Sequence, residues 1–255
     1  MKGETPEIAT PVRLYAEIGS TNAEAMRVAA GGERGPIWLR AERQTAGNGR
    51  SGRAWTSEPG NLYATYLRTF TCPAPIVAQL SLVAGVAVWQ SIAAAGGASI
   101  AVGLRLKWPN DVMLRGAKTA GILLEATSIS GREETSVAIG IGVNVAHHPT
   151  DSAKPATSMA ANGVDITPDA MLAALDGALR VELEIWNGGN EFGEIRRRWL
   201  ERGLRLGEQI TVNAGGVQRG GFFSGLGDDG ALILRDDQGY EHRLSFGDVD
   251  VLPAA

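Results

Sequence analysis

A glycine-rich segment with two arginines is the first part of the chain whose residues could do chemistry. It reads Gly47-Asn48-Gly49-Arg50-Ser51-Gly52-Arg53-Ala54-Trp55. The spacing contains G-x-G-x-x-G, but a dinucleotide fingerprint opens a helix, whereas a Pro-Gly turn and a strand-like run follow here. Glycines let backbone N–H groups approach a ligand, and guanidinium groups bind phosphate or carboxylate through paired hydrogen bonds. The segment predicts an anion-binding loop, with a mobile surface loop as the alternative.

Lysine and aspartate occur together in a second segment, Lys107-Trp108-Pro109-Asn110-Asp111, which is followed by a turn at Arg115-Gly116 and then by Lys118. An ammonium group neutralises the charge on a phosphoryl group, and a carboxylate can hold Mg²⁺. This combination suits an adenylating site. Trp108 and Pro109 are equally compatible with packing at the end of a strand.

Alternating glycines mark a third segment, Gly140-Ile141-Gly142-Val143-Asn144-Val145. Small residues on one face of a strand leave room for a planar ligand, and the amide of Asn144 could read the edge of an adenine. Close approach of another backbone element explains the glycines equally well.

Other chemistries find little support. Gly116-Ala117-Lys118-Thr119 lacks the upstream phosphate loop of a Walker A sequence. His147, His148 and His242 make a poor metal set, because no further His or Cys ligand lies nearby. No Ser or Cys lies in an elbow motif, and Cys72 is the only cysteine. Covalent catalysis through an enzyme nucleophile is therefore disfavoured.

The charge is distributed unevenly along the chain. Residues 40–118 contain nine Lys and Arg against three acidic residues, whereas residues 205–255 contain four basic and eight acidic residues and account for the whole net charge of −4. A local positive excess suits a polyanionic ligand such as a nucleoside triphosphate; nucleic acid and a solvated basic face remain open on charge alone.

Bulk composition indicates a globular, intracellular protein. Hydrophobic residues make up 44% and charged residues 20% of the 255 residues, which is ordinary for a soluble domain. A single cysteine fits a reducing cytoplasm. The start, MKGETPEIATPVR, lacks the apolar core of a signal peptide, and apolar stretches such as Leu80–Val88 are too short to span a bilayer. We therefore expect no membrane association.

The elements that must position these residues form an α+β body. Thr21–Glu24 has the spacing of a capping box at the start of a helix that ends at Gly31-Gly32, and Thr167-Pro168 opens a helix that ends near Asn187-Gly188. A further helix is expected to end at Gly203. A largely apolar helix is expected at Ala78–Ala95, and strands at Ile37–Arg43, Leu62–Phe70, Ile100–Lys107, Gly121–Thr127 and Thr135–Val145.

After Leu206 the pattern changes to short strand-like runs separated by turns, the sharpest at Asp229-Gly230. The runs are Gln209–Asn213, Val217–Leu226, Ala231–Arg235, Glu241–Ser245 and Asp248–Val251. We predict two domains, residues 1–204 and residues 205–255, of which the second is a small all-β barrel or sandwich.

In this order and spacing, the motifs resemble those of the biotin–protein ligase family. The matching pieces are Ser20-Thr21-Asn22, Arg43-Gln44-Thr45-Ala46-Gly47 running on to Arg53-Ala54-Trp55, Asn61-Leu62-Tyr63, Lys107 to Asp111, Lys118 to Leu123, and Gly140 to Val145. The resemblance implies a mixed sheet with helices on one face, similar to the class II synthetases, followed by an SH3-like barrel.

The resemblance also implies a reaction. Biotin and ATP form biotinyl-5′-AMP and pyrophosphate, and a lysine of a biotin carboxyl carrier protein then takes the biotinyl group, with Mg²⁺ as cofactor. The catalytic residues would be Lys118, Arg50, Arg53 and Asp111, of which Asp111 is linked to Mg²⁺. Biotin would contact Ser20, Thr21, Gln44, Gly47, Asn48, Arg50, Trp55, Lys118, Gly121 and Leu123. ATP would contact Arg50, Arg53, Lys107, Asn110, Lys118 and Asn144.

Two departures from the family and two alternatives accompany this interpretation. Asn48 stands where many members have a basic residue, and about a dozen residues precede the catalytic body, too few for the DNA-binding domain of repressor members. We therefore expect no nucleic-acid binding. The protein is expected to be a monomer or a homodimer. A lipoate–protein ligase and a non-catalytic biotin-binding regulator are the alternatives. The loop 147–158 is expected to be mobile without ligand.

Overall fold

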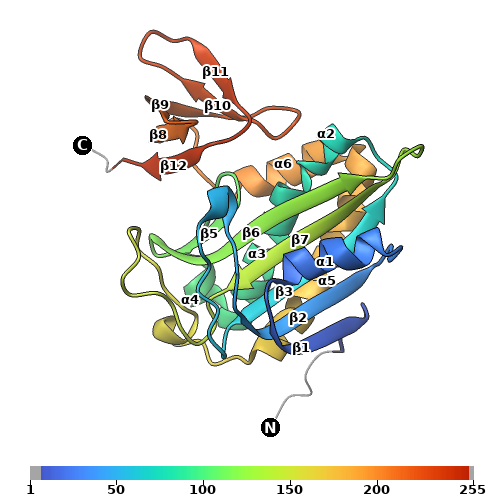
Figure 1. Ribbon diagram of the computed structural model, residues 1–255. Coiled ribbons are helices and arrows are strands. Elements are labelled where there is room, and N and C mark those ends of the chain that lie inside the picture. Colours follow the sequence, from blue (N-terminus) through green and yellow to red (C-terminus); the bar gives the residue numbers. More distant parts are fainter. Residues whose placement is uncertain (1–6, 253–255) are drawn as a thin grey trace.

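The computed structural model describes residues 7–252 and consists of two sheets and the helices packed on the larger one (Figure 1). The expectation made on the start of the chain, MKGETPEIATPVR, falls partly outside this range, since residues 1–6 are not described. The larger sheet has seven strands in the order β1-β2-β3-β7-β6-β5-β4. Only β1 and β2 are parallel, and the other neighbours are antiparallel. The strands are β1 (Val12–Ile18), β2 (Ile37–Gln44), β3 (Leu62–Phe70), β4 (Leu104–Lys107), β5 (Asp111–Leu114), β6 (Ala117–Ser128) and β7 (Thr135–Val143).

The long helices cover one face of this sheet. They are α3 (Leu80–Gly96), α5 (Pro168–Trp186) and α6 (Phe192–Leu200), with the single turns α2 (Ala74–Val77) and α4 (Ala98–Ala101) beside them. Alternation along β2 shows the division of the faces, because Trp38 belongs to the core under these helices whereas Ile37 and Leu39 belong to a smaller cluster under α1 (Thr21–Ala30). The predicted mixed sheet is confirmed, and α1 on the other face leaves part of that face open.

The core helix passes a length and composition test for a membrane span. The segment Pro75–Gly96 is the one described stretch that is long and apolar enough, so the expectation that the apolar stretches are too short is wrong. Of an 18-residue window within it, 67% is buried inside the protein, and α3 packs between the sheet and α5. Burial in the core explains its composition.

The second sheet comprises the five strands expected after Leu206. They are β8 (Gln209–Ala214), β9 (Val217–Leu226), β10 (Leu232–Arg235), β11 (Glu241–Leu244) and β12 (Asp248–Val251), in the order β11-β10-β9-β8-β12. This arrangement is compatible with an SH3-like module, and the domain boundary near residue 204 stays a prediction. Trp108 is buried and its indole N–H donates to the Gly230 carbonyl at 3.0 Å, so this side chain packs the second sheet against the first.

Two local predictions were wrong, and one strand was missed. The helix cap is Ser20, whose Oγ accepts from the Ala23 N–H at 3.4 Å, and Thr21 is the first helical residue. The stretch expected as a strand from Ile100 begins as the end of α4, and the strand starts only at Leu104. Strand β1 was not predicted, although its sequence VRLYAEI is apolar at every second position; it is an edge strand whose Val12 and Leu14 are exposed.

Asp176 on α5 fixes the start of the described chain to the core. Its buried carboxylate accepts from the N–H groups of Ala9 and Thr10 at 3.0 and 3.3 Å and from the Trp38 indole at 2.9 Å. Because these donors have no other acceptor here, Asp176→Ala should lower the free energy of unfolding by about 2–4 kcal/mol. Urea denaturation measures this loss. Asp165→Asn, on an exposed loop, is the control, and an unchanged midpoint for Asp176→Ala would contradict the assignment.

Candidate active site

A cavity of about 440 Å³ lies on the face of the large sheet that α1 leaves open. It is lined by all but one of the residues singled out in the sequence: Ser20, Thr21, Gln44, Asn48, Arg50, Arg53, Trp55, Lys107, Asn110, Asp111, Lys118, Gly121, Leu123 and Asn144. The exception is Gly47, which lies buried behind the wall. Residues that are far apart in the sequence therefore meet at one place, and their individual roles stay predictions.

Glycines on this face make room for protein side chains. A Cβ at Gly142 would lie 2.6 Å from the Trp55 indole, one at Gly121 would lie 3.0 Å from it, and one at Gly140 would lie 2.2 Å from Asn22 Oδ1. The sequence left open whether a planar ligand or another protein element uses the space beside these glycines. In the structure, Trp55 and Asn22 occupy the space. Trp55 Nε1 has no hydrogen-bond partner within residues 7–252, although it is buried beside the cavity.

A β-bulge turns Lys118 toward the cavity. The partner of Lys118 on β5 is Met113, whereas the partner of Ala120 is Val112, so β6 has one extra residue. In a regular strand, residues 118 and 121 would face opposite sides, and the bulge puts them on the same side. The Lys118 Nζ then lies 2.5 Å from Asp111 Oδ1 and 5.3 Å from the centre of the Trp55 ring. A cation and a carboxylate thus meet at the edge of the cavity.

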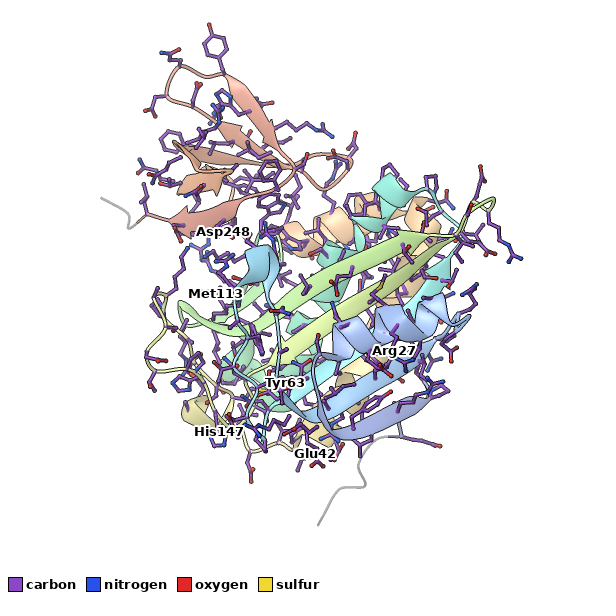
Figure 2. All side chains as sticks on the ribbon, viewed as in Figure 1. Arg27, Glu42, Tyr63, Met113, His147 and Asp248 are labelled. Atoms are coloured by element: carbon purple, nitrogen blue, oxygen red, sulfur yellow. The ribbon has the colours of Figure 1, made fainter. Side chains whose placement is uncertain are left out.

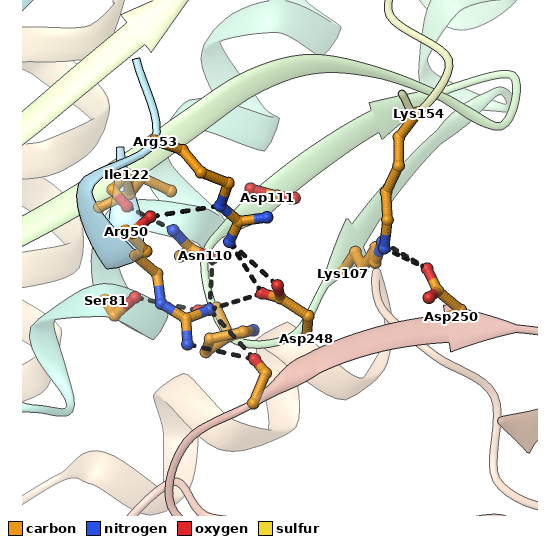
Figure 3. A network of polar contacts seen from close by, with 12 residues as sticks. Arg50, Arg53, Ser81, Lys107, Asn110, Asp111, Ile122, Lys154, Asp248 and Asp250 are labelled. Carbon is orange, nitrogen blue, oxygen red and sulfur yellow. Dashed lines mark hydrogen bonds and ion pairs between the residues drawn. The ribbon is translucent and has the colours of Figure 1, made fainter. Parts of the chain in front are cut away.

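The two arginines of the glycine-rich segment meet a carboxylate of the second sheet (Figure 3). Arg53 Nη2 lies 3.0 Å from Asp248 Oδ2, and Arg50 Nη1 lies 3.6 Å from Asp248 Oδ1. Arg50 also donates to the Gly247 carbonyl at 3.1 Å and to Asn110 Oδ1 at 3.2 Å. Burial alone would raise the pKa of Asp248, but the Arg53 hydrogen bond and the nearby positive charges outweigh it and lower that pKa. In Figure 2, Asp248 stands where the second sheet faces the first.

The second carboxylate of β12 contacts two lysines. Asp250 Oδ1 lies 2.5 Å from Lys154 Nζ and 3.6 Å from Lys107 Nζ. Burial lowers the pKa of Lys107, and the positive charge of Lys154 lowers it further. Four cations line the cavity beside β12, namely Arg50, Arg53, Lys107 and Lys154. Each of them lies beside a carboxylate of the protein.

Two asparagines hold the backbone around the cavity. Asn110 Nδ2 donates to the Ile122 carbonyl at 2.6 Å, which ties the Lys107–Asp111 turn to β6. Asn144 Nδ2 donates to the Thr157 carbonyl at 3.0 Å, and the Thr157 N–H donates to the Lys118 carbonyl at 2.9 Å. These bonds give the 147–158 loop a defined path along the wall. The adenine contact expected from Asn144 stays a prediction, since its N–H₂ group already has a partner.

The opposite end of the cavity is uncharged and polar. Gln44 Oε1 accepts from the Thr21 N–H at 2.8 Å and from the Thr21 hydroxyl at 3.0 Å. Behind them, the Thr65 hydroxyl lies 2.8 Å from Thr21 Oγ1 and 2.7 Å from Asn22 Oδ1. The Asn48 amide turns back to the Ala46 carbonyl at 3.0 Å. The cavity therefore joins a neutral hydrogen-bonding end to a cationic end.

Metal binding and covalent catalysis find few residues here. No three His, Cys, Asp or Glu side chains within residues 7–252 converge on a possible metal position. Magnesium in nucleotide sites is held by one or two carboxylates plus phosphate oxygens. Asp111 is one of three aspartates that line the cavity, with Asp151 and Asp248, and it fits a site shared with phosphate oxygens. Cys72 is buried in the core and burial raises the pKa of its thiol, which disfavours a nucleophilic thiolate.

The acidic residues that complete the site were not predicted from the sequence. Asp248, Asp250 and Lys154 were not among the predicted site residues, and neither were Asn22 and Thr65. The opposite charge of residues 40–118 and 205–255 was a signal for the first two, because complementary segments of one chain attract each other. The contacts of Asn22 and Thr65 had no comparable signal.

Proteins of similar sequence and structure show the family to which the chain is related. A model described as the biotin/lipoate A/B protein ligase family matches residues 33–144. The chain is 39% identical to the biotin–[acetyl-CoA-carboxylase] ligase of Paracoccus denitrificans, over 95% of this chain and 98% of that protein. It is 35% identical to the protein of that name from Mycobacterium tuberculosis, over 92% and 87% of the two chains. The structure of a biotin protein ligase from Aquifex aeolicus in complex with biotin and ATP matches with a TM-score of 0.77 and 26% identity, over 96% and 99%.

The chain therefore belongs to the biotin/lipoate A/B protein ligase family, on its biotin–[acetyl-CoA-carboxylase] ligase side. The resemblance inferred from six short motifs is confirmed, and the lipoate alternative is not favoured.

The contact between Gly142 and Trp55 can be tested directly. Gly142→Ala puts a Cβ 2.6 Å from the indole, so the ring must move, and we expect a loss of about 1–3 kcal/mol of stability with a changed tryptophan emission spectrum. Gly177→Ala is the control, because nothing lies within 4 Å of that position on α5. A Gly142→Ala protein with unaltered emission and stability would show that Trp55 does not rest on the sheet.

Proposed function

We propose that this chain is an ATP-dependent biotin–protein ligase that activates biotin as biotinyl-5′-AMP and transfers it to a lysine of a biotin carboxyl carrier protein. The observation that carries the proposal is the cavity itself, because a neutral polar end suits an uncharged ring and a cationic end suits a carboxylate and phosphates. Relatives named biotin–[acetyl-CoA-carboxylase] ligase and a related structure with biotin and ATP support the same choice.

The chemistry requires positioning and charge neutralisation more than a reactive side chain. In the first step an oxygen of the biotin carboxylate attacks the α-phosphorus of ATP and forms a P–O bond. The bond between the α-phosphorus and the bridging oxygen breaks, and pyrophosphate leaves. In the second step the amine of the target lysine attacks the acyl carbon, loses a proton and displaces AMP. Holding the reactants together and stabilising the phosphoryl charge supply the rate enhancement. Neither step needs an enzyme nucleophile.

The proposed roles follow the two ends of the cavity. Thr21 and Gln44 would bind the ring of biotin together with Ser20, and Trp55, Gly121 and Leu123 would enclose its tail. Lys118 would lie between the carboxylate and the α-phosphate, because it is the cation that the bulge turns inward beside Trp55. The remaining phosphate contacts would come from Arg50, Arg53 and Lys107, and the adenine side from Asn110 and Asn144.

Magnesium would be held by Asp111 together with phosphate oxygens, and would neutralise phosphate charge. Asp111 is the acidic member of the Lys107–Asp111 turn and lines the cavity beside Lys118. We also propose that the reaction takes place in the cytoplasm, which is supported by the free thiol of Cys72. The oligomeric state is proposed as monomer or homodimer, without binding to nucleic acid.

Transfer to a carrier tests the proposal as a whole. The purified chain should biotinylate a carboxyl-carrier domain in the presence of biotin, ATP and Mg²⁺, as followed by mass spectrometry. A carrier whose target lysine is replaced by arginine is the control and should remain unmodified. Modification by lipoate but not by biotin would overturn the choice of substrate, and biotin binding without pyrophosphate release would favour a non-catalytic regulator.

Lys118→Ala separates catalysis from binding. Removal of the ammonium group should slow pyrophosphate release by about 100-fold or more, because a phosphoryl charge loses its counter-charge. Isothermal titration should still detect biotin binding, since the ring end of the cavity is untouched. Arg132→Ala, on the exposed β6–β7 connection, removes the same charge outside the cavity and should change neither quantity. Joint loss of activation and biotin binding would instead assign Lys118 to the biotin pocket.

A further inference from the structure

Ser57 lies directly behind the polar end of the cavity without lining it. Its side chain is buried, and its Oγ lies 3.1 Å from Gln44 Nε2 and 2.9 Å from the Trp55 carbonyl. Gly47 is the residue that makes this contact possible, because a Cβ there would lie 2.7 Å from Ser57 Oγ and 3.0 Å from Gln44 Nε2. Gly47 therefore serves a contact between two side chains.

The orientation of the Gln44 amide is determined by its contacts with Thr21 and Ser57. The Thr21 backbone N–H can only donate, so the atom of Gln44 that it contacts at 2.8 Å must be the oxygen. The amide nitrogen of Gln44 consequently faces Ser57. The single hydroxyl proton of Ser57 goes to the Trp55 carbonyl, which can only accept, and the Ser57 oxygen accepts from Gln44 Nε2.

The hydrogen-bonding positions of Gln44 that have no protein partner define what its side chain can offer to a ligand. Gln44 Oε1 accepts from the Thr21 N–H, and the Thr21 hydroxyl lies 3.0 Å from the same oxygen. One of the two Gln44 N–H bonds is used by Ser57, and the other is left over. Gln44 can therefore present an N–H donor to a ligand, and it cannot present its oxygen in place of that N–H without losing the bond from the Thr21 backbone N–H.

We propose that Ser57 is a positioning residue that holds the Gln44 amide in the orientation in which an N–H faces the substrate ring. The inference rests on the proposed function, in which Gln44 contacts the cyclic urea of biotin. A urea carbonyl accepts this N–H, whereas the dithiolane ring of lipoate offers no comparable acceptor. A polar pocket that leaves a donor without a partner rejects such an analogue strongly.

A double-mutant cycle tests whether Ser57 acts through Gln44. Ser57→Ala should raise the KM for biotin about five- to tenfold, as expected for one lost hydrogen bond, and leave kcat and the KM for ATP unchanged. In a Gln44→Ala background, Ser57→Ala should add nothing further, because the group that it positions is gone. Ser91→Ala is the matched control, since this serine is equally buried but bonds only within α3.

Each contrary outcome has a separate meaning. An unchanged KM for Ser57→Ala beside a raised KM for Gln44→Ala would overturn the inference and leave the proposed function standing. Additive effects of the two substitutions would also overturn it, because they would assign Ser57 a structural role of its own. An unchanged KM for Gln44→Ala would instead contradict the site assignment within the proposed function.

A second variant tests the orientation even if Ser57→Ala does not fold. Gln44→Glu replaces the N–H₂ group by oxygen and keeps an acceptor, so it should raise the KM for biotin at least as much as Gln44→Ala. A Gln44→Glu enzyme with a KM near that of the wild type would show that the ring is bound by an oxygen of residue 44, which is the opposite orientation. Thermal unfolding of each variant provides the check on folding.

Discussion

The close approach of side chains to one face of the large sheet is the constraint on which the site depends. Gly121 and Gly142 have no side chains, so the Trp55 indole can lie against the backbone of β6 and β7. A methyl group at Gly142 would displace the ring. With Trp55 in place, Lys118 packs over its ring and reaches Asp111. The shape of the cavity therefore depends on the backbone of β6 and β7 below Trp55, and the long helices on the opposite face hold these strands rigid.

The two ends of the cavity are organised by different physical means. At the neutral end, buried hydroxyl and amide groups are hydrogen-bonded in a fixed direction, which gives geometric specificity at little cost in charge. At the cationic end, Arg50, Arg53, Lys107 and Lys154 contact the two aspartates of β12 (Figure 3). These contacts are partly exposed and individually weak, and as a group they join the second sheet to the catalytic face.

Most of the fold and much of the cavity could be predicted from the sequence, for physical reasons that differ between elements. The strands after Leu206 are bounded by clear turn signals, and the helix from Pro168 has a cap, an apolar face and an end at Asn187. Strand β1 was missed although VRLYAEI alternates, and exposed Val12 and Leu14 show that pairing with β2, more than burial of these side chains, stabilises this edge strand. Propensity alone does not report such pairing.

The parts of the site that were missed depend on register and on contacts between distant segments. The bulge that turns Lys118 inward is a property of the pairing with β5 and leaves no trace in the residue types. The glycines at 140 and 142 were correctly singled out, but the sequence could not say whether a ligand or a side chain fills the space beside them.

The aspartates of β12 have one more consequence for how the cavity meets an anion. Its cations are already neutralised by carboxylates that are covalently part of the chain, so an entering phosphate takes part in an ion exchange instead of filling an empty positive field. The displaced ion cannot diffuse away as dissolved chloride would, and it remains at a high local concentration beside the site. When the anion leaves, the same carboxylates return to the cations without any search through solution.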